Sequence, residues 1–571
     1  MDKPPTIFGL ETEYGIFIPI DQENGLGWMT SLAAYDVVQA ISELNVSSIN
    51  RGLEGIQDQQ EHHIVEQEAI DTQHDLYDLL RRRPSPGIRQ RRALTGFILE
   101  TGARWYVDLG HPEYSTPEVT NPYDIVLVQK AGDWIAEECR KRAQERMRVR
   151  RENPDIVIHI HRNNSDGRGS SYAAHENYAL TPDIFTKIIQ YASTIVWCPY
   201  HRRHERAMHP SKSELTNFVL KFFVTRQIIT GSGKVGSEVD EQVPYQISQR
   251  ADFMCQELGL STVEHRPIIN TRDQPHADEN LLRRLHVIVG DSNMSELSIY
   301  LKFGITSLFF QMIESGMAEH APGTLAVPIV NAVRAYRGVS RDLTLMRKIR
   351  LTDGSRTTAY ETQVEFCEWA KTFVARKNLA PVWHDVINKW EGALQGLGGG
   401  DRGKHAIAGN LDWVKKERLL AEYQKKTGDG PLDEGSRSLA LAYHDINPEW
   451  SIYDLLVRQG RIMRLVGDEE IAHAIHNPPS DTRAWLRGEL MHRYPSHLSD
   501  IGWNYAYFTD NTLLHMDHPS HGTKKQIVPI VSDDPPLDVF LARLKELIDA
   551  HLLPGYVLSS FEHDVRSRNL R

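Results

Sequence analysis

Polar side chains recur at every second position of segments that otherwise resemble buried β-strands, and this pattern restricts the fold more than any other feature of the chain. In GLETEYG the pair is Glu11 and Glu13, and in ARWYVDLGHPEY the set is Arg104, Tyr106 and Asp108. Because alternate residues of a strand face one side of a sheet, we expect each set to share a face. Carboxylates on one buried face repel one another unless cations lie among them. The pattern therefore favours magnesium, which prefers oxygen ligands and also binds nucleotide phosphates.

Further segments extend the same pattern. Glu113 follows a short turn after the second strand, YAAHENY places His175 and Asn177 two residues apart, and RRLHVIVG does the same with Arg284 and His286. A single buried acid is more often part of an ion pair, and a single histidine is more often structural than a ligand. Two strands that carry histidines, together with two strands that carry carboxylates, favour one site that binds both metal ions and a nucleotide.

Composition limits the classes of function. The chain has 571 residues, 40% hydrophobic and 25% charged, which is typical of a globular protein. Its net charge of −11 argues against general binding to nucleic-acid backbones. The N-terminus lacks the apolar core of a signal peptide, and no apolar run approaches the ~20 residues of a membrane span. We therefore expect a cytoplasmic protein with neither nucleic-acid nor membrane partners. Its 4 cysteines are far apart in the sequence and do not have the spacing of a zinc site.

The order of expected elements indicates an α+β fold. Strand-like segments are IFGLETEYGIFI, GARWYVDL, DIVIHIH and RRLHVIVG, whereas apolar residues from Leu297 to Met312 mark one helix face that stops at Gly316. These elements alternate irregularly and show no internal repeat. The pattern thus predicts α+β rather than a regular βαβ array.

The chain divides into a large domain, residues 1–477, and a small C-terminal domain, residues 478–571, which begins after a proline pair and ends with an amphipathic helix. Within the large domain, residues 50–93 are polar and almost free of large apolar side chains, so we expect a mobile loop. A second polar insertion covers residues 199–214.

The glycine-rich segment GSGKVG does not qualify as a Walker A phosphate loop. That loop requires a glycine five residues before the Gly-Lys pair and Ser or Thr after it, and Ile228 and Val235 occupy those places. The common nucleotide-binding folds therefore have no support here.

Ordered blocks over most of the chain resemble the enzymes of bacterial pupylation, the Pup deamidase/depupylase and its sister Pup ligase. The blocks are GLETEYG, TGARWYVDLGHPEYSTPE, NNSDGRGSSYAAHENY, FVTRQIITGSGKVG, PIINTRDQPHAD, RRLHVIVGDSNMSE, LDWVKKERLL and PPSDTRAWLRGE. The resemblance implies a glutamine-synthetase-like large domain, with a β-sheet cradle packed by helices, plus a small C-terminal domain.

The resemblance also implies roles for individual residues. Magnesium ligands would be Glu11, Glu13, Tyr106, Glu113, His175 and His286. ATP contacts would be Arg104, Ser115, Thr116, Asn177, Arg284 and Trp503. Asp108 matches the catalytic aspartate, which we expect to be ionised and to act as nucleophile or general base.

Several features favour the hydrolytic branch of this family. DLGHPEY has the spacing of the depupylases, YQISQRADFMCQELGLST and NPPSDTRAWLRGE resemble that branch, and the polar stretch 50–93 lies where depupylases insert a loop. PIINTRDQPHAD and GDSNMSE instead resemble the ligase. We expect a depupylase and deamidase, with an ATP-consuming Pup ligase as the alternative. A catalytically silent Pup- or nucleotide-binding protein is disfavoured because Asp108 is retained.

The implied cofactors are ATP and Mg²⁺, with ATP as a bound cofactor because amide hydrolysis is downhill. The implied partners are Pup, pupylated proteins and the proteasomal ATPase. The sequence leaves open whether the local Pup ends in Gln or Glu, whether Asp108 is nucleophile or base, and the oligomeric state.

Overall fold

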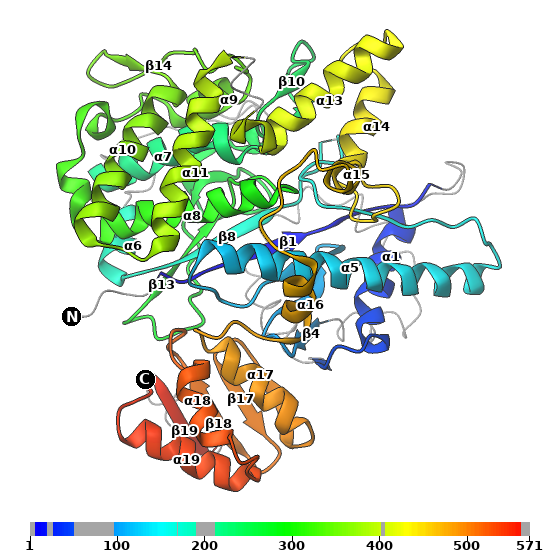
Figure 1. The fold of residues 1–571 in the computed structure, drawn as a ribbon, viewed down its shortest axis with the longest axis vertical. Helices are drawn as coiled ribbons and strands as arrows, with labels where there is room; N and C mark the ends of the chain where they lie inside the picture. The colour runs from blue at the N-terminus through cyan, green and yellow to red at the C-terminus, as the bar shows by residue number, and fades with distance from the viewer. Residues whose placement is uncertain are drawn as a thin grey trace.

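The computed structural model describes residues 6–19, 27–50, 96–167, 169–189, 212–400 and 406–560. These residues form a large region of helices around an antiparallel sheet and a smaller C-terminal region with its own sheet (Figure 1). The predicted α+β class, with a β-sheet cradle packed by helices, is confirmed. Within these ranges, no helix is long and apolar enough to cross a membrane.

A seven-stranded sheet forms the centre of the large region, and every neighbouring pair of its strands is antiparallel. In spatial order the strands are β13 (Arg283–Val287), β8 (Ala174–Leu180), β1 (Phe8–Glu13), β6 (His111–Ser115), β5 (Arg104–Asp108), β4 (Gly96–Leu99) and β3 (Ser48–Asn50). The predicted alternation is present: Phe8 and Leu10 of β1 enter the hydrophobic core, whereas Glu11 lines a cavity on the other face. One face of the sheet is therefore a core surface and the other is polar.

Helices cover the apolar face of this sheet. Those in contact with its strands are α1 (Gly27–Gln39), α5 (Pro122–Arg151), α6 (Pro182–Ile189), α7 (Glu214–Thr230) and α8 (Glu296–Glu314). Behind α7 and α8 pack α9 (Ala332–Ser340), α10 (Ala359–Lys377) and α11 (Pro381–Gly398). Two buried clusters join them to the strands, one around α7 and α8 and one between α1, α5 and the side chains of Trp105 and Tyr114. Figure 1 shows the long helix α5 crossing the sheet beside β1. This packing leaves the polar face as the surface available for a site.

The ends of these helices follow ordinary capping rules. Asn121 caps α5 by accepting hydrogen bonds from two backbone amides of the first turn, Pro122 takes the first helical position, and arginines occupy the last turn. The predicted helix face from Leu297 to Met312 becomes α8, which ends before Gly316, where φ is +80°.

Shorter elements complete the large region. The two-stranded sheets pair β2 (Gly15–Phe17) with β7 (His159–His161), β9 (Lys234–Val235) with β10 (Tyr245–Gln246), β11 (Gln256–Gly259) with β12 (Pro267–Asn270), and β14 (Ile349–Arg350) with β15 (Arg356–Thr357). The remaining helices are α13 (Asp412–Thr427), α14 (Glu434–Ala442), α15 (Ile452–Arg458) and α16 (Asp468–His476). The strand-like segments that the sequence indicates become β1, β2, β5, β7 and β13.

The C-terminal region has a separate four-stranded antiparallel sheet and a hydrophobic cluster of its own, drawn in orange and red at the bottom of Figure 1. Its elements are α17 (Ala484–Arg493), β16 (Leu498–Ile501), β17 (Tyr505–Phe508), β18 (Thr512–Met516), α18 (Lys524–Val531), α19 (Leu537–Asp549) and β19 (Tyr556–Ser560). The amphipathic helix expected near the end is α19, which buries Phe540 and Leu544. That residues 478–571 fold as an independent domain stays a prediction.

A buried ion cluster joins the two regions. Glu118 accepts a hydrogen bond of 2.8 Å from Arg483 Nε, and a second one of 3.1 Å from Arg487 Nη1. Burial alone raises the pKa of Glu118, but the charges of Arg487 and Arg483 outweigh it and hold the pKa at about 2. The contact fixes the C-terminal region against the segment that follows β6.

Two sequence predictions fall largely outside the described residues. The expected mobile loop at 50–93 is described only at residue 50, and the insertion at 199–214 only from residue 212.

Candidate functional site

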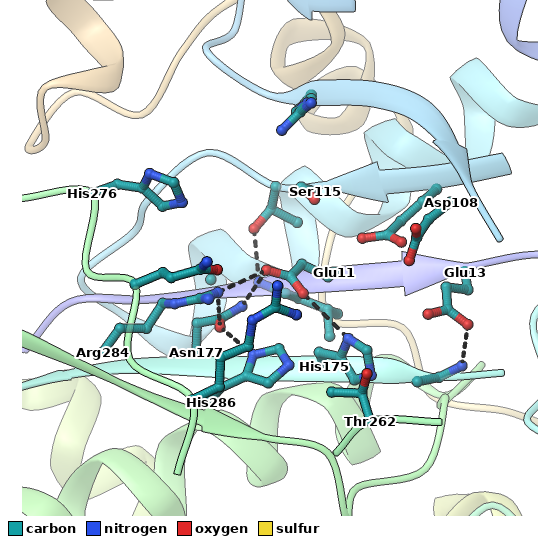
Figure 2. A pocket seen from close by; sticks show the side chains of 18 of the residues that line it. Glu11, Glu13, Asp108, Ser115, His175, Asn177, Thr262, His276, Arg284 and His286 are labelled. Carbon is teal, nitrogen blue, oxygen red and sulfur yellow. Dashed lines mark hydrogen bonds and ion pairs between the residues drawn. The ribbon is translucent and has the colours of Figure 1, made fainter. Parts of the chain in front are cut away.

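The polar face of the central sheet lines a cavity of about 950 Å³. Its wall includes every residue that the sequence singled out: Glu11, Glu13, Arg104, Tyr106, Asp108, Glu113, Ser115, Thr116, His175, Asn177, Arg284, His286 and Trp503. Figure 2 shows Arg284 and Asn177 on one side of Glu11, and Asp108 and Glu13 on the other. The cavity therefore has a basic end and an acidic end.

Strand register explains why residues far apart in the chain meet here. One row across the sheet holds His175, Glu11, Ser115 and Arg104, each directly opposite the next. The adjacent row holds Glu13, Glu113 and Tyr106. Side chains directly opposite one another in an antiparallel sheet lie about 4.5–5.5 Å apart at Cβ, so each row is a contiguous set of polar groups.

Glu11, His175 and His286 form the first potential metal cluster, with ligand atoms within 4.8 Å of one another. The Nδ1 atom of His175 lies 3.2 Å from Glu11 Oε2, and the two imidazole rings are 4.7 Å apart between centroids. Burial raises the pKa of Glu11, but its hydrogen bond with His175 and the charge of Arg284 hold that pKa well below its usual range. Glu11 is therefore ionised and able to bind a cation.

A hydrogen-bond network orients this cluster. Asn177 Nδ2 donates to Glu11 Oε1 over 3.1 Å, while Asn177 Oδ1 lies 3.0 Å from Arg284 Nη1 and 3.0 Å from His286 Nδ1. With Nδ1 of His286 donating to the amide oxygen, its Nε2 keeps a free lone pair. That Nε2 atom is buried and has no hydrogen-bond partner among the described residues. It is thus poised as a metal ligand.

Glu13, Asp108 and Glu113 form the second potential cluster, again with ligand atoms within 4.8 Å of one another. Burial and the neighbouring charge of Glu13 raise the pKa of Asp108 to about 7. Burial, together with the charges of Asp108 and Glu13, also raises the pKa of Glu113 well above its usual range. Without cations, Asp108 is therefore only partly ionised near neutral pH, and the ionised Asp108 expected from the sequence stays a prediction for the cavity with cations bound.

Tyr106 lies between the two clusters. Its hydroxyl donates a short hydrogen bond to Glu113, and the Arg104 guanidinium lies 4.5 Å from the centre of its ring. Burial, followed by the charge of Glu113, raises the pKa of the Tyr106 phenol well above 10. Tyr106 therefore stays protonated without metal, and it would contact a cation through a neutral oxygen.

A tight hairpin between β5 and β6 positions Asp108. Asp108 pairs with His111 across the turn, and the two turn residues, Leu109 and Gly110, have φ of +44° and +89°. Positive φ at both positions is typical of the two-residue turns that connect twisted antiparallel strands. An additional residue here would change the turn geometry and the direction of the Asp108 carboxylate.

The C-terminal region contributes to the basic end of the cavity. Arg487 Nη1 donates to the carbonyl oxygen of Trp503 over 2.8 Å, and its guanidinium lies 5.2 Å from the Trp503 ring. Thr116, which also lines the cavity, accepts a hydrogen bond of 3.0 Å at Oγ1 from the backbone amide of Leu10. Trp503 therefore offers an aromatic surface to a ligand held on the sheet.

Sequence reasoning missed an arginine group on the cavity wall, comprising Arg250, Arg266, Arg272 and Arg283. Arg250 is fully buried and donates to Ser171 Oγ over 2.8 Å, while its Nη2 lacks a hydrogen-bond partner among the described residues. No periodicity marks these arginines, because they come from connecting segments and short strands. They make one side of the cavity suited to an anionic ligand.

The two clusters fit divalent cations. Glu13, Asp108 and Glu113 lie together at the acidic end of the cavity, and the pKa values of Asp108 and Glu113 are raised. The buried Nε2 atom of His286 has no hydrogen-bond partner in the part of the chain that the structure describes. A cation among them would offset the repulsion and occupy the free lone pair. Oxygen donors dominate the set, as magnesium prefers.

A family model described as Pup-ligase protein matches residues 6–507. The chain is 35% identical to a depupylase of Acidothermus cellulolyticus and 32% identical to a Pup deamidase/depupylase of Mycobacterium tuberculosis, in both cases over 88% of this chain and 90% of the relative. It is also 36% identical to a Pup–protein ligase of Kribbella flavida, over 72% of this chain and 84% of the relative.

Two solved structures are similar in fold. The Pup ligase PafA in complex with Pup gives a TM-score of 0.68 at 26% identity, with 95% of each chain covered. PafA in complex with ADP gives a TM-score of 0.63 at 27% identity, covering 82% of this chain and 94% of the other.

Proposed function

The chain belongs to the Pup-ligase family, and we propose that it is a depupylase. Such an enzyme hydrolyses the isopeptide bond between the side chain of the C-terminal glutamate of Pup and a lysine of a modified protein. The same site would deamidate a Pup that ends in glutamine. Both substrates present a γ-carboxamide, so one arrangement of groups serves both reactions.

The placement of Asp108 carries this proposal. Asp108 is held at the acidic end of the cavity by a two-residue hairpin, beside Glu13 and Glu113. In that position its carboxylate is suited either to attack a carboxamide carbon or to take a proton from an attacking water. Water supplies the atoms that the reaction consumes, and the products are a free carboxylate on Pup and a free lysine amine.

The basic end of the cavity supports ATP as the bound cofactor. Arg104 and Arg284 offer fixed guanidinium groups to phosphates, and Trp503 offers a ring for the base. PafA, a relative of similar fold, has been solved with ADP. Magnesium ions held by Glu11, Glu13, Tyr106, Glu113, His175 and His286 would bind the phosphates and polarise a substrate oxygen.

Pup and pupylated proteins are the proposed macromolecular partners, together with the proteasomal ATPase. PafA has been solved in complex with Pup, and the arginines that line this cavity would complement an acidic segment. Hydrolysis of the isopeptide bond would not consume the bound ATP.

A Pup ligase is the second candidate. The ligase of Kribbella flavida is 36% identical, and both similar solved structures are of a ligase. The depupylase of Acidothermus cellulolyticus, however, covers 88% of this chain against 72% for the Kribbella ligase. This difference, with the two-residue turn after Asp108, favours hydrolysis.

The direct experiment compares the wild-type protein with Asp108→Asn on a purified Pup–protein conjugate in the presence of Mg²⁺ and ATP. We expect the wild type to release free Pup, and the variant to bind ATP normally while losing cleavage by several orders of magnitude, comparable to the roughly 10⁴-fold or greater losses seen when a principal catalytic group is removed. Equal cleavage rates would show that Asp108 is a structural carboxylate.

A further inference from the structure

A third cluster of potential metal ligands lies outside the cavity and has no part in the proposed reaction. His159, His161 and Asp445 bring one ligand atom each within 4.8 Å of the others. The two histidines are alternate residues of β7, so their side chains share one face of that strand. Asp445 reaches them from the segment between α14 and α15, which is paired with β7 by a bridge at His161.

The cluster is rigidly framed. On either side of it, the Arg162 amide donates to the His444 carbonyl over 2.8 Å, and the Ile446 amide donates to the Ile160 carbonyl over 3.0 Å. The second oxygen of Asp445 accepts a hydrogen bond of 2.8 Å from the Asn447 amide. The Asn447 amide thus holds Oδ1 of Asp445 in place, while Oδ2 faces the imidazoles. In metal sites, hydrogen bonds of this kind to the ligands set their orientation.

The distances in the cluster suit a tetrahedral ion. Asp445 Oδ2 lies 2.7 Å from His159 Nδ1 and 3.8 Å from His161 Nε2. Two ligand atoms that each lie about 2.0–2.1 Å from a tetrahedral zinc ion are separated by roughly 3.3 Å, a value between these two distances. Shifts of about half an ångström would therefore bring both carboxylate–imidazole distances to this value, and the two imidazole nitrogens already lie within 4.8 Å of each other.

We propose that His159, His161 and Asp445 bind a divalent transition-metal ion, with zinc as the probe, at a site distinct from the magnesium site of the cavity. Two imidazoles and a carboxylate are typical of zinc and related ions, whereas magnesium favours oxygen donors. Glu137, whose pKa is raised by burial and in part by the charge of Asp445, is engaged by Arg140 at 2.6 and 2.8 Å and is not free to bind an ion. Water therefore takes the fourth position.

The surroundings reinforce this choice of ion. The ring of Phe17 lies 6.2 Å and that of Trp450 lies 5.6 Å from the ring of His159, and both aromatic side chains are at least half exposed. They form an apolar rim around a site that solvent still reaches from one side, which strengthens binding of a charged ion and leaves an entry path.

The bound ion would tie β7 to the 444–446 segment. The chain leaves β7 at His161 and continues through Ser171 and Tyr172, which line the cavity, to β8. The ion would therefore hold one end of a cavity wall without touching substrate. Its role is structural, and its loss lowers stability before it lowers activity.

The test uses the full chain without a polyhistidine tag, freed of metal by a chelator and dialysed against buffered zinc. Zinc bound per chain is measured by elemental analysis for the wild type, His161→Gln and Asp445→Asn. His384→Gln, an exposed histidine of α11, is the matched control. A His286→Gln variant reports any zinc taken up by the cavity cluster.

We expect the wild type and His384→Gln to hold one more equivalent of zinc than His161→Gln or Asp445→Asn. The affinity of this site should fall at least about tenfold in both variants, because loss of even an outer contact costs about 10- to 100-fold. Zinc should also raise the melting temperature of the wild type more than that of Asp445→Asn, which keeps the comparison valid if His161→Gln does not fold. Equal zinc content in wild type and Asp445→Asn, or no zinc in the wild type, overturns the proposal.

Discussion

Replacing the proposed catalytic aspartate should stabilise the metal-free protein. In the absence of cations, burial and the charge of Glu13 raise the pKa of Asp108 to about 7 from the usual 3.8. A carboxyl group with a raised pKa in the folded state favours folding fully below its unfolded pKa and loses that contribution as the pH rises through its folded pKa. The metal-free wild type should therefore lose stability between about pH 4 and pH 7, and Asp108→Asn should lose less, because the raised pKa of Asp108 is then gone and that of Glu113 remains.

The size of the effect follows from the same pKa. A difference of about 3 in pKa corresponds to on the order of 4 kcal/mol, since each pKa unit is worth about 1.4 kcal/mol. Asp108 is half-buried, and solvent screening reduces this to about 2–4 kcal/mol. Asp108→Asn should thus unfold at higher denaturant concentration than wild type at pH 8 and at the same concentration near pH 4.

Urea unfolding in the presence of a chelator, at a series of pH values, measures this difference. Asp155→Asn, at an exposed position, is the control and should follow the wild type throughout. Adding Mg²⁺ should narrow the gap at pH 8, because a cation beside Glu13 and Glu113 stabilises the ionised Asp108. A difference between Asp108→Asn and wild type that does not change with pH, or a less stable variant at pH 8, would refute the electrostatic account of this cavity.

Three further predictions concern binding and assembly. Glu11→Gln and Glu113→Gln should abolish magnesium-dependent ATP binding in calorimetric titrations, since each removes a charge from one cluster; unchanged affinity in both would make the acids structural. Trp503→Ala should weaken ATP binding by about 1–3 kcal/mol, the usual worth of an aromatic ring stacked on a base, and an unchanged Kd would place the base elsewhere. Glu118→Gln should destabilise the protein to urea by about 3–5 kcal/mol because it leaves buried Arg483 and Arg487 uncompensated, whereas Asp549→Asn, in an exposed pair with Lys545, should cost under about 1 kcal/mol.

Strand periodicity explains how much of the site could be predicted. Glu11 and Glu13 share a face because β-strands alternate, and the same rule places His175 and Asn177 on one face of β8, where His175 lies opposite Glu11. Leu10, the apolar neighbour of Glu11, enters the core as expected. Local sequence is sufficient in such cases, because the side-chain direction depends only on position within a strand.

Long-range packing accounts for what the residues alone did not reveal. Trp503 reaches the cavity only because Arg483 and Arg487 dock the C-terminal region onto Glu118, and its place was predicted from resemblance rather than from any spacing. The raised pKa of Asp108 likewise depends on charges from other strands. His159 and Asp445 are 286 positions apart in the chain, so no sequence window contains their cluster.

The ratio of ADP formed to Pup released distinguishes hydrolysis of a conjugate from its ATP-driven formation. Purified protein with Mg²⁺ and ATP is given a Pup–protein conjugate and, separately, free Pup with an acceptor protein, and free Pup, conjugate and ADP are followed together. The account predicts that conjugate is converted to free Pup with far less than one ADP per Pup, and that no conjugate forms from free Pup. Accumulation of conjugate with one ADP formed per bond would contradict it and identify the chain as a ligase.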